Sequence, residues 1–159
     1  MTAKMDNKVA LSILAAIVLL AIIFLIYTFG GGHTPASSVA GQYVQPAPSY
    51  APQGQLVTGF PQSLVLDKDP SFSQSYSVSY SASLDQYTAI WNSSSSPTTL
   101  FNAYKNYFTE NGWTITNQQT SAAVEGLYAN NGSAVANAVF AAEGGGSQVT
   151  IGYASEAGQ

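Results

Sequence analysis

Few residues in this chain have side chains suited to catalysis. His33 is the only histidine, there is no cysteine, and the four basic residues are all lysines, at positions 4, 8, 68 and 105. A serine nucleophile needs a base within hydrogen-bond reach, and beyond residue 29 only Lys68 and Lys105 could supply an amine. Nucleophilic catalysis of the serine–histidine or cysteine–histidine kind is therefore not expected.

Carboxylates are the remaining candidates for chemistry. Two acids across a cleft can perform glycoside hydrolysis, but the acids after residue 29 lie mostly in predicted turns, helix ends or the tail. Asp67 and Asp69 have a spacing that can ligate Ca²⁺, yet such a site needs about six to eight oxygens, and a turn closed by Pro70 fits better. We expect no enzyme, no metal and no cofactor, and keep a carboxylate-based envelope enzyme as an alternative. The acids are Asp67, Asp69, Asp85, Glu110, Glu125, Glu143 and Glu156.

Charge excludes one class of partner. After residue 29 the chain carries seven acidic residues and two lysines, a formal charge of −5, and the whole chain has no arginine. Nucleic-acid binding needs basic residues to neutralise phosphates, so it is excluded. Only 8% of the residues are charged, against about 25% in typical soluble domains. The absence of cysteine is compatible with a location outside the cytoplasm.

A long apolar run, Val9–Phe29, contains no charged residue, Pro or Gly. About 20 such residues cross a bilayer core, and helix is the structure that satisfies the backbone there. Lys4 and Lys8 precede the run, which predicts a cytoplasmic N-terminus and an outside C-terminus. Because a signal peptide has a shorter apolar region, of about 7–15 residues, an uncleaved single-pass anchor is favoured over a cleaved signal. Residues 1–8 are then a cytoplasmic stub.

Residues 30–59 are rich in Pro, Gly, Ser and Gln, a composition that predicts a disordered linker. We interpret this linker as a spacer between membrane and domain, with a proline-type docking motif as the alternative. His33 lies in it, where a lone histidine is neither a catalyst nor a metal site. The folded domain is predicted to span residues 60–155, with a tail at 156–159.

The clearest strand is Ser71–Leu84, in which every odd position is serine. Side chains alternate between the two faces of a strand. The serines are thus expected on a wet face and the even positions, including Tyr76 and Tyr80, in the core. An uncharged hydroxyl strip on an exposed sheet face is a candidate interaction surface, and the alternative is that the serines simply solvate that face. Its members are Ser75, Ser77, Ser79 and Ser81.

A helix with full end signals follows a second strand, Tyr87–Asn92. Ser96 is the expected N-cap, Pro97 the first residue, and Gly112 the residue after the end, which predicts a helix over Pro97–Asn111. Four strands are then expected, at Trp113–Gln118, Ala122–Ala129, Ser133–Ala142 and Gln148–Ala154. The order β-β-α-β-β-β-β predicts an α+β fold, an antiparallel sheet with the helix on one face. The predicted core comprises Tyr76, Tyr80, Trp91, Leu100, Tyr104, Phe108, Trp113 and Ile151.

The hairpin, the helix ending in Gly112-Trp113 and the final strands resemble small uncharacterised α+β domains of bacterial single-pass membrane proteins and lipoproteins. The residues that carry this resemblance are packing residues, so it implies the fold and no activity. We expect a membrane-anchored, extracytoplasmic module that binds or assembles with an envelope protein or a neutral polymer. A pilin-like or cell-surface structural subunit is the alternative, although Lys8 and Ile13 stand where a type IV pilin has glycine and glutamate. The matching residues are Tyr76, Tyr87, Trp91, Tyr104, Asn111, Gly112, Trp113, Val149 and Tyr153.

Overall fold

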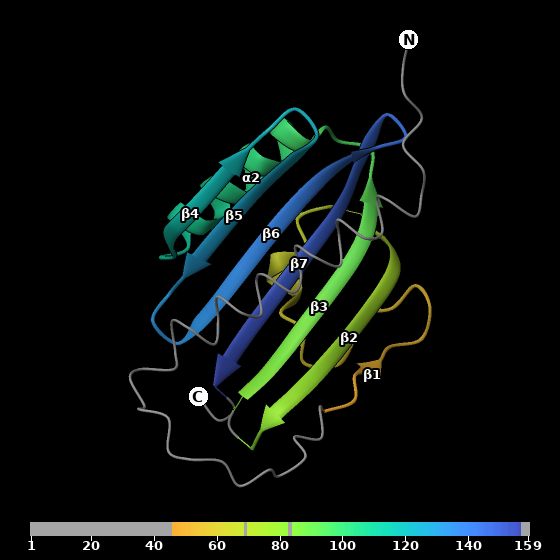
Figure 1. Ribbon diagram of the computed structural model, residues 1–159, viewed down its shortest axis with the longest axis vertical. Helices are drawn as coiled ribbons and strands as arrows, with labels where there is room; N and C mark the ends of the chain where they lie inside the picture. Colours follow the sequence, from red (N-terminus) through yellow and green to blue (C-terminus); the bar gives the residue numbers. More distant parts are fainter. Residues whose placement is uncertain (1–45, 69, 83, 157–159) are drawn as a thin grey trace, which may run out of the picture. The chain divides into compact units, whose positions relative to one another are not determined.

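The computed structural model describes residues 46–68, 70–82 and 84–156. In this part the chain forms one seven-stranded antiparallel sheet and one α-helix, with the strand order β1-β2-β3-β7-β6-β5-β4 (Figure 1). The predicted α+β class and antiparallel sheet are confirmed. The elements are β1 (Ser49–Tyr50), the 3-10 helix η1 (Gln62–Leu64), β2 (Ser71–Ser81), β3 (Leu84–Ser93), α2 (Pro97–Glu110), β4 (Thr114–Thr120), β5 (Val124–Asn130), β6 (Ala134–Glu143) and β7 (Gly146–Glu156).

Several predictions from the sequence concern other residues. The cytoplasmic stub, the membrane anchor Val9–Phe29, His33 and the linker up to residue 45 lie outside the described residues. Within residues 46–156, leaving out 69 and 83, no helix is long and apolar enough to cross a membrane.

Helix α2 begins and ends where local chemistry predicts. The Ser96 side chain accepts a hydrogen bond from the Thr99 amide at 3.2 Å, and Pro97 occupies the first turn. At the other end Gly112 has a φ of +76°, which favours glycine, and the Trp113 amide donates to the Phe108 carbonyl at 2.9 Å. This six-to-one bond, with the Trp113 ring 5.5 Å from the Phe108 ring, is the Schellman ending of a helix.

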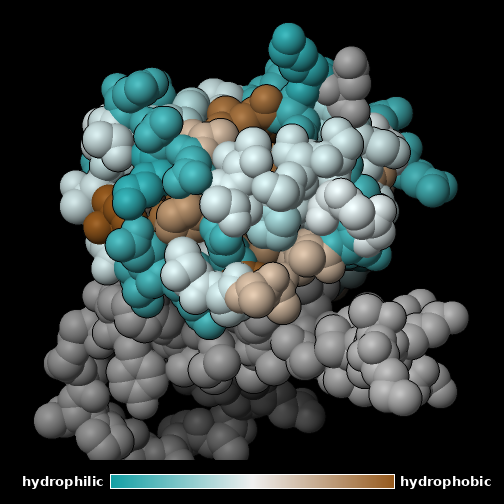
Figure 2. Space-filling view, turned by 90° about the horizontal axis from the view of Figure 1, so that it is seen from above, coloured by the Kyte–Doolittle hydropathy of each residue, from teal (hydrophilic) through white to brown (hydrophobic). Residues whose placement is uncertain are grey.

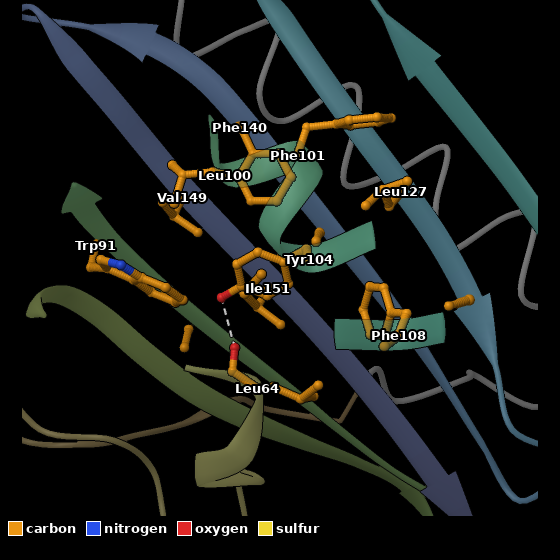
Figure 3. Close-up of a cluster of buried hydrophobic side chains, with 14 of the residues drawn as sticks. Leu64, Trp91, Leu100, Phe101, Tyr104, Phe108, Leu127, Phe140, Val149 and Ile151 are labelled. Carbon is orange, nitrogen blue, oxygen red and sulfur yellow. Dashed lines mark hydrogen bonds between the residues drawn. The ribbon is translucent and has the colours of Figure 1, made fainter. Parts of the chain in front are cut away.

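One face of the sheet holds the core. Helix α2 covers β5, β6 and β4, and the segment around η1 lies over the β2–β3–β7 half of the same face (Figure 1). Figure 3 shows the Tyr104 ring at the centre of this core, with its hydroxyl donating to the Leu64 carbonyl at 2.7 Å. The side chains buried most completely in it include Trp91, Tyr104, Phe108, Phe140, Leu64, Leu127, Ile151 and Val149.

The folded part starts earlier than Phe60, the residue at which the sequence suggested it. β1 pairs with β2, Val57 is 9% exposed, and the Val57 amide donates to Ser75 Oγ at 3.0 Å. Gly59, at φ +93°, lies against the Tyr87 ring so closely that a Cβ atom would be 2.8 Å from it. Residues 49–59 therefore belong to the folded domain rather than to a linker, because a few spaced apolar contacts and backbone bonds hold them on the sheet.

Strand β2 changes faces part-way along its length. Phe72 pairs with Trp91 and Gln74 with Ile90, so one extra residue, Ser73, is accommodated on β2 between them. Such a β-bulge reverses the side-chain alternation beyond it. Phe72 accordingly packs on Trp91, with ring centroids 5.6 Å apart, whereas the even-numbered residues that follow point to the other face.

Candidate interaction surface

The second face of the sheet is the one opposite the core. Among the described residues, no helix or loop packs against it, because α2 and the segment 51–66 both lie on the core face. The register places Tyr50, Tyr76 and Val78 on this second face, in line with Thr88 and Gln86 of β3.

Large exposed hydrophobic side chains gather on one half of the second face. Of the described residues, those recorded as large, hydrophobic and exposed are Tyr50 (57%), Tyr80 (44%) and Leu84 (40%). They belong to β1, β2 and β3, three neighbouring strands. We call Tyr50, Tyr76, Tyr80 and Leu84 the tyrosine surface. Contiguous exposed hydrophobic groups of this kind mark interaction sites.

Two rings of the tyrosine surface are close to one another. Tyr50 and Tyr76 lie side by side, with centroids 5.3 Å apart and planes tilted by 49°. Partial burial, followed by the field of Tyr76, raises the pKa of the Tyr80 hydroxyl above its ordinary value of 10.0. The Tyr80 hydroxyl is thus neutral at physiological pH, and the tyrosine side chains offer polar tips on an apolar body.

Charge is sparse on the second face. Along its interior the register positions are filled by uncharged residues, and the carboxylate residues Glu143 and Glu156 occupy positions at strand ends. In Figure 2, which views the molecule from above rather than onto this face, teal and pale residues cover most of the coloured surface and brown is confined to small areas. Over the whole chain, 8% of the residues are charged.

The serines predicted as a strip do not form one. Ser75 is 3% exposed, accepts from the Val57 amide and donates to the Thr88 carbonyl at 3.1 Å. Ser77 is half-buried opposite Tyr87 on the core side, and Ser79 donates to Asp85 at 2.6 Å. Ser81 is exposed beyond a second register shift near the end of β2. The serine-strip prediction is wrong for Ser75 and Ser77, because the bulge at Ser73 turns the odd positions toward the core face.

The predicted core residues divide in the same way. Tyr76 is half-exposed on the second face because of the bulge at Ser73, and the exposed Tyr80 is the extra residue at the second register shift, so the core prediction is wrong for both. Trp113 is partly buried against Phe108 and Tyr153. The others lie in the core, namely Trp91, Leu100, Tyr104, Phe108 and Ile151.

The carboxylates of the domain hold parts of the fold together. Asp67 accepts hydrogen bonds from the Trp91 indole and, at 3.0 Å, from the Ser93 hydroxyl. Glu125 is 8% exposed and accepts from Thr98 in the first turn of α2 at 2.7 Å, where a negative charge is favourable. Across residues 46–68, 70–82 and 84–156, no three His, Cys, Asp or Glu side chains gather as a metal site would require.

Comparisons with protein-family models, with curated proteins and with solved structures found no match to this chain. The role of the tyrosine surface is therefore inferred from its geometry alone. Sequence reasoning missed Tyr50, because it lies among prolines that read as a linker. No local signal marks the bulge, because residues 71–84 fit one strict alternation throughout.

Proposed function

We propose that this chain is a membrane-anchored, extracytoplasmic binding module with no catalytic activity. Its tyrosine surface docks an uncharged surface of a partner protein in the cell envelope. The observation that carries this proposal is the gathering of Tyr50, Tyr80 and Leu84, all exposed, on a face that no described element covers. The apolar run Val9–Phe29, with Lys4 and Lys8 before it, supports the anchor and its direction.

The chemistry of the surface favours a protein partner. Tyrosine is enriched in protein interfaces because its ring provides a large contact area and its hydroxyl a hydrogen bond. The exposed part of this face is the area around Tyr50, Tyr80 and Leu84, since Thr88, Thr150 and Val139 on the same face are buried. The interior of the face is uncharged, so an ionic partner such as an acidic polymer has no counter-charge to meet.

The test compares two double variants of the full chain used as bait on detergent-solubilised membranes. Tyr50→Lys with Tyr80→Lys places charge in the tyrosine surface, where an unpaired charge is costly to desolvate. Asn102→Lys with Asn106→Lys adds the same charge to the exposed side of α2 and serves as the control. We expect one partner that wild type and control retain and the tyrosine variant loses at least tenfold.

Salt dependence checks the mode of binding. Because the contact is uncharged, the affinity for that partner should change little as ionic strength rises, whereas ionic contacts weaken. Equal capture by the tyrosine variant, with an unchanged circular dichroism spectrum, would refute the proposal. Capture of a neutral polysaccharide in place of a protein would refute the partner class.

The membrane orientation has its own test. Protease added to spheroplasts should remove the chain beyond Phe29 and leave a short N-terminal fragment in the membrane. Protection of residues 46–156 in spheroplasts, with digestion after lysis, would reverse the orientation.

A further inference from the structure

The edge strand β4 is open on its outer side. It is the last strand of the sheet, and six of its seven residues are exposed, with Ile115 partly so. Its inner side is bonded to β5, and among the described residues no strand pairs with its outer side. An outer row of unpaired backbone groups is a template for another strand.

The usual protections of an edge are weak here. The strand reads Thr-Ile-Thr-Asn-Gln-Gln-Thr, with no charged residue and no proline. One bulge lies near its start, between Ile115 and Asn117, and Asn117–Thr120 then runs in unbroken register with β5. By contrast, the opposite edge is the two-residue strand β1, which Pro46 and Pro48 precede. Natural edges are blocked by proline or short length, as β1 is, whereas β4 is not.

We propose that two copies of this chain pair through β4, edge to edge and antiparallel, and so join their sheets. In such a two-fold pairing the residue on the axis meets its own copy, and each neighbour meets the residue equally far on the other side, so a strand with charges of one sign would repel itself. β4 has no charged residue, and its Thr, Asn and Gln side chains can hydrogen-bond to one another across the pair. Self-complementarity of this kind selects a second copy over an unrelated strand.

The position of the pairing follows from the bulge. Only Asn117–Thr120 has regular strand geometry, so the two-fold axis passes at Asn117, Gln118 or Gln119. Lys105, on the helix side, reaches Gln118 Oε1 at 3.4 Å, whereas Asn117 and Gln119 lie on the other face of the strand. A strand of this length buries little area alone, so the pair should be weak in dilute solution. If the proposed anchor holds, tethering both copies to one membrane raises their effective concentration.

Single-cysteine variants of the full chain test the pairing, because the chain has no cysteine of its own. Asn117→Cys, Gln118→Cys and Gln119→Cys are oxidised in vesicles of neutral lipid. A disulfide needs Cα atoms closer than about 7 Å, which only residues directly opposite achieve. One of the three should give a disulfide dimer in large excess over the other two, and the self-paired residue is thereby identified.

The control is Asn92→Cys, exposed on β3, four strands away from β4 and so roughly 19 Å from it. It shares the same chain and anchor but cannot meet its copy in an edge pair. If the membrane segment alone brought copies together, Asn92→Cys would cross-link as readily as the β4 variants. Equal cross-linking at all four positions therefore overturns the proposal.

A charge swap separates pairing from chance collision. In the background of the best cysteine, the residues just before and just after it are both changed to Lys in one sample and to Glu in another, because each of them faces the other's position on the second copy. Each variant alone should cross-link about fivefold less than its parent, because like charges face each other. Mixing the two should restore the cross-link as a Lys–Glu heterodimer. Retained cross-linking in the Lys variant alone, or no recovery on mixing, refutes the pairing and leaves the tyrosine surface untouched.

Discussion

The Tyr104 hydroxyl joins helix α2 to the segment that covers the β2–β3–β7 half of the core. It donates to the Leu64 carbonyl at 2.7 Å and receives a longer bond from the Leu66 amide at 3.5 Å. The Tyr104 side chain is fully buried, with 0% exposure. Changing Tyr104 to Phe removes the hydroxyl and keeps the ring, which stacks near Phe140 at 5.2 Å.

The cost of Tyr104→Phe follows from what is left behind. The Leu64 carbonyl stays buried without its donor, and an unsatisfied buried group costs about 1–3 kcal/mol. The Leu66 amide loses only a weak bond, so we expect about 1–2 kcal/mol less free energy of unfolding. In a domain of this size that corresponds to roughly 4–10 °C in Tm.

Urea unfolding measures the loss, with Tyr107→Phe as the matched control. Tyr107 lies on the same helix, partly buried against Phe108 at 5.9 Å, and its hydroxyl makes no hydrogen bond recorded among the described residues. The control should stay within about 0.5 kcal/mol of wild type. Hydrogen exchange should accelerate most at the amides of Phe60, Leu64 and Val65, which close the turns of the covering segment.

Equal losses for Tyr104→Phe and Tyr107→Phe would refute the role of the hydroxyl. So would exchange that accelerates evenly over the sheet and leaves the segment 57–66 no more affected than β6.

Two further predictions concern pH and chain length. Burial raises the pKa of the Tyr104 hydroxyl well above its ordinary 10.0, so above pH 10 the folded state keeps a proton that the unfolded state loses. The contribution of this group to the free energy of unfolding is therefore constant below pH 10 and falls above it, by at most about 1.4 kcal/mol per pH unit. Tyr104→Phe should lose this part of the pH dependence when unfolding is measured up to about pH 11.5. A fragment starting at Val44 should be at least about 2 kcal/mol more stable than one starting at Phe60, because the shorter one lacks β1, the buried Val57 side chain and the Val57–Ser75 bond; equal urea midpoints would mean that residues 44–59 add nothing to the fold.

Local signals in the sequence predicted the elements well. The helix from Pro97 is specified by its own residues, since Ser96, Pro97 and Gly112 act within one turn of the ends that they determine. The β5–β6 hairpin likewise has its turn residues in sequence, at Asn131-Gly132, where the Asn131 side chain accepts from the Ser133 and Ala134 amides. The turn expected at Asp85-Gln86 is wrong, because both residues lie in β3. Chemistry that acts over a few residues can be read without knowing the fold.

Features that depend on partners far away in the chain could not be predicted from the sequence. Val57 lies in the stretch with the composition of a linker, and only the Ser75 hydroxyl, 18 residues away, shows why it is ordered. The bond from Tyr104 to the Leu64 carbonyl, across 40 residues, was equally impossible to predict from local sequence. The strand order, with β7 between β3 and β6, also depends on the pairing of residues far apart in sequence.

The bulge at Ser73 connects the fold to the proposed function. Strict alternation would require Phe72, Tyr76 and Tyr80 to share a face, yet the core over β2 has room for Phe72 against Trp91 and then is filled by the segment containing Val57. Only small side chains fit beneath that segment, and Ser75, at 3% exposure, supplies both size and hydrogen bonds there. One extra residue resolves the conflict by turning serines inward and tyrosines outward. The small serine side chains on the inner face of β2 thus leave space for the covering segment. The tyrosines are exposed on the opposite face as a consequence.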